Sequence, residues 1–555
     1  MFNPGLPLEG SPRSRILAQD TPELLRNPRL TGAYGYSGLS DDYTNSQNIN
    51  EPPIPSDSLL LFQPSTQAQL LEEFWNWQNT WPFLVHQPLF EKDLAGYGAN
   101  GYFSTAVLSA MLSLSAQYCD EDHSSSWKTS ADSLAQHVKR LVLGQIERPS
   151  LSLALAAALV SLRDLTVGNL ASASQYIGIA CRHAMLLGLH LESSDHSSDS
   201  NDLKEARTLM WLGIWMLEKH ITQILGQPGP IRECDKHPFS VPINPSIEYR
   251  PWPTSDSSLA LTSHCMSNMQ YACDLIRMVS PVISEIYELT GHSTLQAKEE
   301  KATKTHVTMS VFYNNLPSPL RLPATSTTPL PPHVYQLNLQ YHTLKIMLHH
   351  PFINEVPSMK ALQDSQNAQM VHIQSATFSA IRIGQIINAY RNFYPVHRLS
   401  PFTVQSLVVA SLIHLYNANS TDTALAQRSR HLHGLNHQTL HQMAPMTRCS
   451  APAIEFLDSV QHCGVLGANK SSGSQYGSSS NLPAVGPGLA TFVPDNMNMD
   501  LTMDLFDWFE LPLHNELLFD GDYADLLSSE NCEIEQTQCW SVGDDIAATI
   551  TAPSL

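Results

Sequence analysis

The sequence predicts an all-α fold, in which a large multi-helix body lies between a disordered N-terminal arm and an acidic C-terminal tail. Apolar residues recur every three or four positions through most of the stretch from residue 66 to residue 445, which is the period of helices that bury one face. No segment of any length shows the alternation of a half-buried strand. Both ends lose this periodicity and are rich in Gly, Pro and Ser or in acidic residues. The expected layout is therefore an arm over 1–65, a helical body over 66–445, a flexible linker over 446–494 and an acidic-hydrophobic tail over 495–555.

Composition narrows the class of protein. A chain of 555 residues with 42% hydrophobic residues can bury a sizeable core. The net charge of −20 is uneven, because the last 85 residues hold 14 Asp and Glu and no Lys or Arg, which leaves about −6 for the other 470. No basic stripe is present that would neutralise nucleic-acid phosphates. Nine scattered Cys without a Cys-x-x-Cys pair, no signal-peptide core and no apolar run of ~20 residues indicate a soluble intracellular protein in a reducing compartment.

The body opens with an aromatic-rich segment, AQLLEEFWNWQNTWPFLVHQPLFEKDL, over residues 68–94. Aromatic residues at this density are typical of a packed core. Helical patterns follow over 101–119, 134–150, 151–165 and 171–190, and the last of these ends near Gly188. A polar spacer over 193–202 then separates them from the longest amphipathic helix.

That helix extends from Lys204 to Gly226. Asp202 is the expected N-cap and Glu205 its capping-box partner, because residues at this spacing bond each other's backbone N–H groups. Glycine enters the left-handed cap conformation without steric cost, and Pro228 prevents the helix from resuming. The apolar face comprises Leu209, Leu212, Trp215, Met216, Ile221 and Leu225.

Further helices are expected over 260–290, 334–353, 370–395 and 402–418. A Leu-Pro turn over 316–321 and a Pro/Thr-rich loop over 322–332 separate the first two of these.

Several loose motifs occur in a fixed order along this body. They comprise Trp77-Gln78, Pro82-Phe83, His86, Pro88 and Phe90; Arg182 to His190 (RHAMLLGLH); Trp211, Trp215, Glu218, Lys219 and Gly226-Gln227-Pro228; Val241-Pro242; and LPSPLR over 316–321. In this order they resemble the middle homology region, or fungal-specific transcription factor domain, of fungal zinc-cluster transcription regulators, from Leu70 to Ala418. Three positions depart from the commoner family form, since Glu218 stands where Asp is usual, Gln227 where Arg is usual and Phe312 where Trp is common.

The resemblance implies a nuclear regulator of RNA polymerase II genes, acting on a metabolic or secondary-metabolite gene set. The family's DNA reader is a cluster of six Cys that binds two zinc ions near the N-terminus, and this sequence has no Cys before Cys119. No zinc or other cofactor is therefore expected here, and DNA contact is expected to be indirect. It would come through a homo- or heterodimer with a zinc-cluster regulator, or through a missing N-terminal exon. The transcription machinery or a coactivator is the expected partner, and no membrane partner is expected.

The sequence offers few residues for metal binding or catalysis. His431, His433, His437 and His441 form the best metal candidate, since the last three would share one helix face, but no Cys or acidic residue lies near them in sequence. No Gly-x-Ser-x-Gly elbow, phosphate-binding Gly-rich loop or His-Glu-x-x-His motif occurs, so no catalytic residue is assigned and no enzyme is expected. The alternative function is an all-α enzyme or small-molecule-binding protein on the same scaffold.

The tail interleaves bulky apolar residues with acids. Its densest part holds Leu505, Phe506, Trp508 and Phe509 among Asp504, Asp507 and Glu510. Mutually repelling charges keep such apolar groups from collapsing together and leave them available to a coactivator groove. These four apolar residues are the expected activation segment.

Overall fold

The computed structural model describes residues 62–96, 101–118, 124–191, 200–226, 229–231, 240–252, 261–287, 293–323, 328–353 and 362–470. Residues 1–61 of the predicted arm and the whole predicted activation segment lie outside these ranges. The arm prediction is wrong for its last residues, because Phe62 is buried and a helix begins at Pro64.

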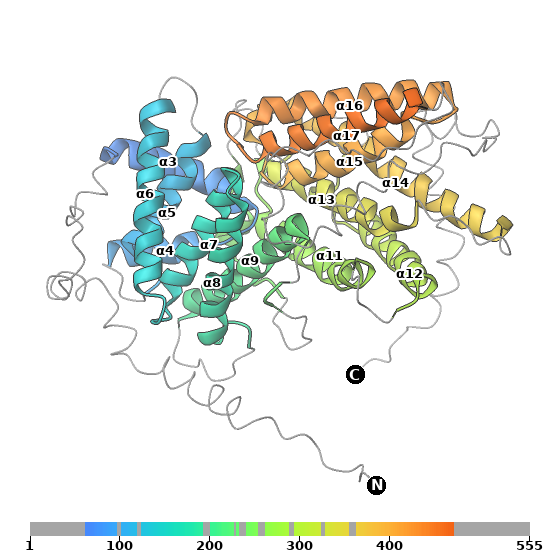
Figure 1. Ribbon diagram of the computed structural model, residues 1–555. Helices are drawn as coiled ribbons and strands as arrows, with labels where there is room; N and C mark the ends of the chain where they lie inside the picture. The colour runs from blue at the N-terminus through green and yellow to red at the C-terminus, as the bar shows by residue number, and fades with distance from the viewer. Residues whose placement is uncertain are drawn as a thin grey trace, which may run out of the picture.

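The first half of the described chain is a succession of helices (Figure 1). In order they are α3 (Pro64–Asn76), η3 (Gln78–Thr80), α4 (Gln87–Ala95), α5 (Thr105–Ser115), η4 (Ala116–Tyr118), α6 (Ser124–Gly144), α7 (Leu151–Thr166), α8 (Leu170–Leu186) and α9 (Asn201–Leu225).

The second half continues in the same way after a short irregular stretch. It comprises α10 (Pro245–Glu248), β1 (Pro251–Trp252), β2 (Leu261–Thr262), α11 (Cys265–Ile286), α12 (Leu295–Asn314), η6 (Ser318–Leu320), α13 (Pro332–His349), η7 (His350–Phe352), α14 (Leu362–Arg391), η8 (Val396–Arg398), α15 (Thr403–Asn417), α16 (Thr423–Met443) and α17 (Ser450–Lys470). Within the described residues, sheet is confined to the antiparallel pairing of β1 with β2. The predicted all-α fold class is confirmed.

A first hydrophobic core joins α3 to α11. Helix α9 lies at its centre, and the side chains of Trp211 and Trp215 are fully buried. Gly213 allows the close approach of α9 to the segment after η3, because a Cβ at this position would lie 2.3 Å from the Phe83 carbonyl oxygen. A glycine is therefore required here by packing.

The ends of α9 confirm one sequence prediction and correct another. Gly226 ends the helix in the left-handed conformation, with a φ of 62°. The N-cap is Ser200, whose Oγ accepts from the Leu203 N–H at 3.3 Å, so the predicted capping box at Asp202 is wrong. Glu205 accepts from the Asn244 amide at 3.1 Å and lies 3.1 Å from His86 Nε2, which draws its carboxylate into long-range contacts.

A second hydrophobic core is formed by α14, α15, α16 and α17 (Figure 1, upper right). Helix α13 belongs to both cores: Leu337, Leu344 and Leu348 pack in the first core, while Leu339 and Ile346 pack in the second. All of these side chains are buried, so α13 is a central helix covered on two sides.

The helical body extends further than the sequence predicts. Ala453, Leu457 and Val460 of α17 are buried in the second core, although the predicted flexible linker begins at residue 446. The linker prediction is therefore wrong for the start of that range. Helix α12 was also not predicted; Val307 and Val311 on it remain exposed, and only Ala302, Thr305 and Met309 are buried.

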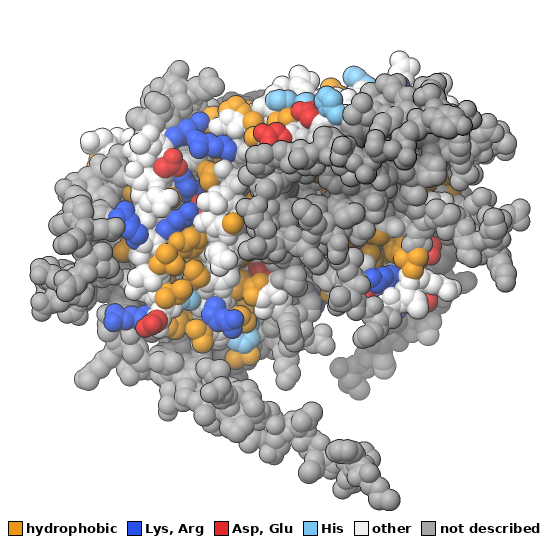
Figure 2. Space-filling view, viewed as in Figure 1, with side chains coloured by type: hydrophobic (Ala, Val, Ile, Leu, Met, Phe, Trp, Pro, Cys, Tyr) orange, Lys and Arg blue, Asp and Glu red, His pale blue; other side chains and the backbone are white. Residues whose placement is uncertain are grey.

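On the face shown in Figure 2, the Lys and Arg side chains of the described residues lie scattered among hydrophobic and acidic ones. None of the described helices combines the length and the apolar character needed to span a bilayer.

Candidate functional site

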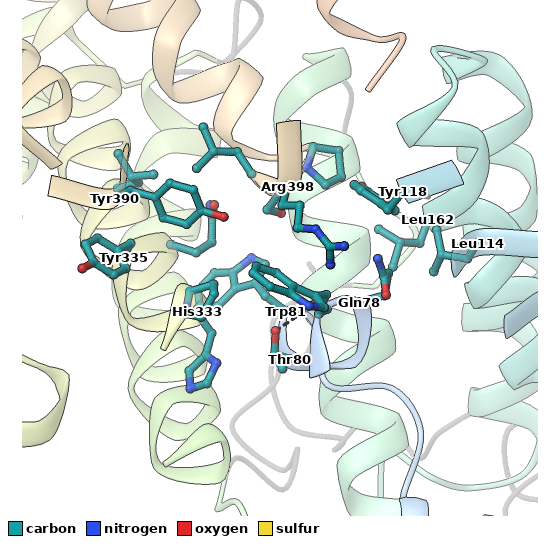
Figure 3. Close-up of a pocket in the computed structure, with 17 residues that line it drawn as sticks. Gln78, Thr80, Trp81, Leu114, Tyr118, Leu162, His333, Tyr335, Tyr390 and Arg398 are labelled. Atoms are coloured by element: carbon teal, nitrogen blue, oxygen red, sulfur yellow. Dashed lines mark hydrogen bonds between the residues drawn. The ribbon is translucent and has the colours of Figure 1, made fainter. Parts of the chain in front are cut away.

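A buried cavity lies where the two cores meet (Figure 3). The centre of a water molecule can occupy about 50 Å³ of it. The walls come from the turn after α3, from η4 and α7, from the first turns of α13, and from the segment between the end of α14 and α15. The lining residues include Trp77, Gln78, Thr80, Trp81, Leu114, Tyr118, Leu162, His333, Tyr335, Gln336, Leu339, Tyr390, Arg398, Leu399 and Ser400.

The turn that carries Gln78 and Trp81 is fixed by the side chain of Asn79. Its amide donates to the Val85 carbonyl at 2.8 Å, and its oxygen accepts from the backbone N–H groups of Leu84 and Val85 at 3.2 and 2.9 Å. Thr80 Oγ1 donates to the Trp77 carbonyl at 2.8 Å. Satisfied buried backbone groups of this kind hold a loop in one conformation, so the two side chains enter the cavity in fixed positions.

Six side chains that line the cavity carry buried polar atoms without a hydrogen-bond partner among the described residues. They are Gln78 Oε1, Trp81 Nε1, His333 Nδ1, Gln336 Nε2, the Tyr390 hydroxyl and Ser400 Oγ. All of these side chains except that of Ser400 are more than nine-tenths buried. A buried polar atom that makes no hydrogen bond costs free energy, so six such atoms around one cavity are an unusual arrangement.

Arg398 is the charged side chain in the cavity wall. Its guanidinium pairs with Glu73 of α3 and lies over the Trp77 ring, 4.8 Å from the ring centroid. The ion pair leaves the site without net charge and connects α3 to the chain segment before α15. Burial raises the pKa of Tyr390 well above its usual range, so its hydroxyl stays protonated and able to donate.

A second cavity lies beside the first and shares Thr80 with it. Water centres can occupy about 220 Å³ there, between Trp75, Phe83 and Trp252. The Arg250 guanidinium in its wall donates to the oxygens of Gln87 at 2.6 Å and Asn76 at 3.3 Å. Glu91, which is exposed, also lines this cavity and accepts from the Gln87 amide at 2.7 Å.

The sequence-predicted signature residues of α9 lie apart from both cavities. Trp211 and Trp215 are packed in the first core, and Lys219 Nζ lies 3.4 Å from Glu218 Oε2 and donates to the Ile231 carbonyl at 3.0 Å. Gly229 lies close against Glu218, because a Cβ at this glycine would fall 1.6 Å from Glu218 Oε1. These contacts fasten the chain after Gly226 to the helix, whereas Gln227 and Pro228 lie outside the described residues.

The predicted histidine face forms on α16. His433 and His437 have ring centroids 6.0 Å apart, and those of His437 and His441 are 4.8 Å apart. The structure places an acidic residue beside this face: Asp458 of α17 lies 2.9 Å from His437 Nε2, although the two residues are 21 positions apart in the sequence. Over the described residues, no group of three or more His, Cys, Asp and Glu has an arrangement that could hold a metal ion.

Part of the cavity wall could be predicted from the sequence. Gln78 belongs to the aromatic-rich segment singled out at the start of the body, and Trp81 follows three residues later. Gln336, Tyr390 and Arg398 were missed, because none of them belongs to a local motif and more than 250 residues separate them from Gln78.

The comparisons with known proteins agree with this helical body. Residues 71–314 match the model of the fungal specific transcription factor domain. Over 408 residues the chain is 24% identical to the nitrogen assimilation transcription factor nirA of Emericella nidulans, covering 70% of this chain and 44% of the relative. Over 403 residues it is 22% identical to the nitrogen assimilation transcription factor nit-4 of Neurospora crassa, covering 67% of this chain and 35% of the relative. A third relative, the transcription factor FBD3 of Fusarium pseudograminearum, is 27% identical over 202 residues, 32% of this chain and 24% of the relative.

The fold is thus that of a large helical domain. More specifically, residues 71–314 are similar to the fungal specific transcription factor domain and the relatives are named as transcription factors, which confirms the resemblance drawn from the motifs. The matched parts cover less than half the length of these three relatives.

Proposed function

We propose that this chain is the regulatory part of a nuclear transcription regulator that controls RNA polymerase II genes of a metabolic pathway. The observation that carries the proposal is the domain match over residues 71–314, together with relatives that are named as transcription factors. Two of those relatives are named for nitrogen assimilation, which makes genes of nitrogen metabolism the first gene set to test.

The helical body is proposed to regulate, and the tail to activate. Over residues 495–530 the acids are accompanied by no Lys or Arg, so the segment cannot bury enough apolar surface alone to offset its ordering entropy. On a coactivator it could form a short helix with Leu505, Trp508 and Phe509 on one side. Burying two of these aromatics supplies roughly 3–5 kcal/mol before ordering costs, which suits weak and exchangeable recruitment.

DNA contact is proposed to come from outside this sequence, since the six-Cys cluster of the resembled family is not in it. A partner regulator with a zinc cluster would supply it, or a segment encoded upstream of Met1. In this scheme the chain itself binds protein partners and is not an enzyme.

A tethered reporter tests the proposal. The full chain, fused to an unrelated DNA-binding domain in a fungal host, should raise reporter output, and the triple variant Phe506→Ala, Trp508→Ala, Phe509→Ala should lose most of that rise. A matched control in the same tail is Asn496→Ala, Asn498→Ala, Thr502→Ala, which removes side-chain volume without removing apolar anchors. If both triple variants activate equally, the aromatic segment is not the activating element. If the intact fusion is silent in all growth conditions, the transcriptional role itself fails.

A further inference from the structure

The cavity between the two cores has the features of a small binding site. Of its six buried, unpartnered atoms, three are hydrogen-bond donors: Trp81 Nε1, Gln336 Nε2 and the Tyr390 hydroxyl. Gln78 Oε1 is an acceptor. His333 Nδ1 is also an acceptor, because Nε2 of the same ring donates to the Ser263 carbonyl at 2.6 Å, and the Ser400 hydroxyl can donate or accept. The far end of the Gln336 amide is held by Thr403 Oγ1, which donates to its oxygen at 2.9 Å, and this bond keeps the amide nitrogen available on the other side.

The six atoms come from chain segments that belong to different parts of the fold. Gln78 and Trp81 follow α3, His333 and Gln336 lie in α13, Tyr390 lies near the end of α14, and Ser400 lies between η8 and α15. In Figure 3 the Tyr390 hydroxyl and the Arg398 guanidinium point toward the same central space. A molecule bound there would therefore contact the first core and the second core at once.

The ion pair in the cavity wall disfavours the binding of an anion. The cationic Arg398 is already paired with Glu73, so an added anion would have to compete with a carboxylate for the same guanidinium, and both side chains of this pair are only partly exposed. A neutral molecule has no such competition. Its carbonyl oxygen could accept from the three donors, and its N–H could donate to Gln78.

The size of the cavity also limits the ligand. A space of about 50 Å³ for water centres holds a few waters or a molecule of only a few non-hydrogen atoms. Even a well-fitted ligand of that size reaches an affinity on the order of micromolar to millimolar. This range suits a metabolite present at high concentration.

We propose that this cavity binds a small uncharged molecule with a carbonyl group and an amide N–H, such as a simple primary amide or urea. Trp81, Gln336 and Tyr390 donate to its carbonyl oxygen, and Gln78 accepts from its nitrogen. Because the ligand joins the two cores, its binding stabilises their present arrangement. The proposal is independent of the transcriptional role, since it concerns the purified chain.

Saturation-transfer NMR on the full chain tests it, with acetamide as the probe and acetate as the charged molecule of the same shape. Acetamide at about 20 mM should show transfer and raise the unfolding temperature, while acetate should do neither. Tyr390→Phe deletes one donor and keeps the ring, whereas Trp81→Phe deletes one donor and leaves a smaller aromatic ring; each should weaken acetamide binding about tenfold. Tyr416→Phe removes a hydroxyl that does not line the cavity and should leave binding unchanged.

Three results would overturn the proposal. The first is no acetamide binding to a folded wild-type chain, which would mean that the cavity holds water only. The second is equal binding of acetate and acetamide. The third is unchanged acetamide affinity in both Tyr390→Phe and Trp81→Phe, with circular dichroism confirming that the variants are folded. None of these results depends on reporter activity, so failure here is distinguishable from failure of the transcriptional role.

Discussion

The two core regions of this protein are packed with different kinds of side chain. Around α9 the first core uses large aromatic residues and a close backbone approach at Gly213. The region from α13 to α17 instead buries many histidines, and desolvation lowers the pKa of His414 to about 3 and of His350 to about 4.

A chain of histidines that reaches from this second region to α12 makes the contrast concrete. His349 lies 2.8 Å from His306 through one ring nitrogen and 2.7 Å from His372 through the other, and His372 Nε2 lies 3.2 Å from Glu299. Burial lowers the pKa of all three histidines, and each charge would oppose the next. The difference teaches that the packing of α9 at Gly213 depends on side-chain volume, whereas the stability of the histidine-rich region also depends on protonation.

The largest effect should come from Gly213→Ala. The new methyl group would meet the Phe83 carbonyl oxygen, a backbone atom that cannot move without disturbing the turn at Asn79. We expect a loss of about 3 kcal/mol or more in the free energy of unfolding, equal at pH 7.5 and pH 5.5. Chemical denaturation measures it, with Gly178→Ala in α8 as the control because its Cβ would meet nothing within 4 Å. A variant as stable as the wild type would mean that α9 and the Phe83 segment are not in close contact.

An intermediate effect is expected from pH in the second region. The pKa of His414 is lower in the folded protein than the unperturbed value of about 6.5, so its contribution is complete above that pH and is lost as pH falls toward 3. Between pH 7.5 and 5.5 this one group should cost about 1 kcal/mol. His414→Leu keeps the volume and removes the titration, so its denaturation midpoint should fall less steeply with acidification. An unchanged slope would show that His414 does not contribute to the pH dependence.

The smallest effect should have the opposite sign. Gly434 lies within α16, and a Cβ there would meet nothing within 4 Å. Gly434→Ala should therefore stabilise the protein by roughly 0.5–1 kcal/mol, because alanine loses less backbone entropy in a helix. When both variants are measured in the same denaturation assay, the comparison of Gly434→Ala with Gly213→Ala distinguishes the general preference of helices for alanine from the steric collision at residue 213. Destabilisation by Gly434→Ala would mean that α16 is more tightly covered than its contacts indicate.

The parts of the fold that sequence could predict are those governed by neighbouring residues. The burial of the α9 face and the end of this helix at Gly226 depend on spacing and on backbone freedom alone. Helix α12 could not be predicted from the sequence, because few of its residues are buried and its apolar pattern is weak. For α17, the Gly/Ser-rich stretch that follows it obscured a short apolar face.

The candidate site could be predicted from the sequence even less well, because its residues are far apart in the chain. Arg398 reaches Glu73 across 325 positions of sequence, and Trp81 and Tyr390 are almost as distant from each other. Nothing local in either segment marks these residues as neighbours. The same holds for Glu205, whose contacts with His86 and Asn244 replaced the capping role that its spacing from Asp202 indicated.

The sharing of α13 between the two cores has a consequence for the order in which the protein is made. Leu337, Leu344 and Leu348 belong to the first core, yet more than 100 residues separate them from the end of α9. At ribosomal rates that stretch takes roughly 5–20 s to synthesise. During this interval the nascent chain carries an incomplete core with an uncovered apolar face, and a chaperone that shields it should bind after α9 emerges and leave once α13 has docked.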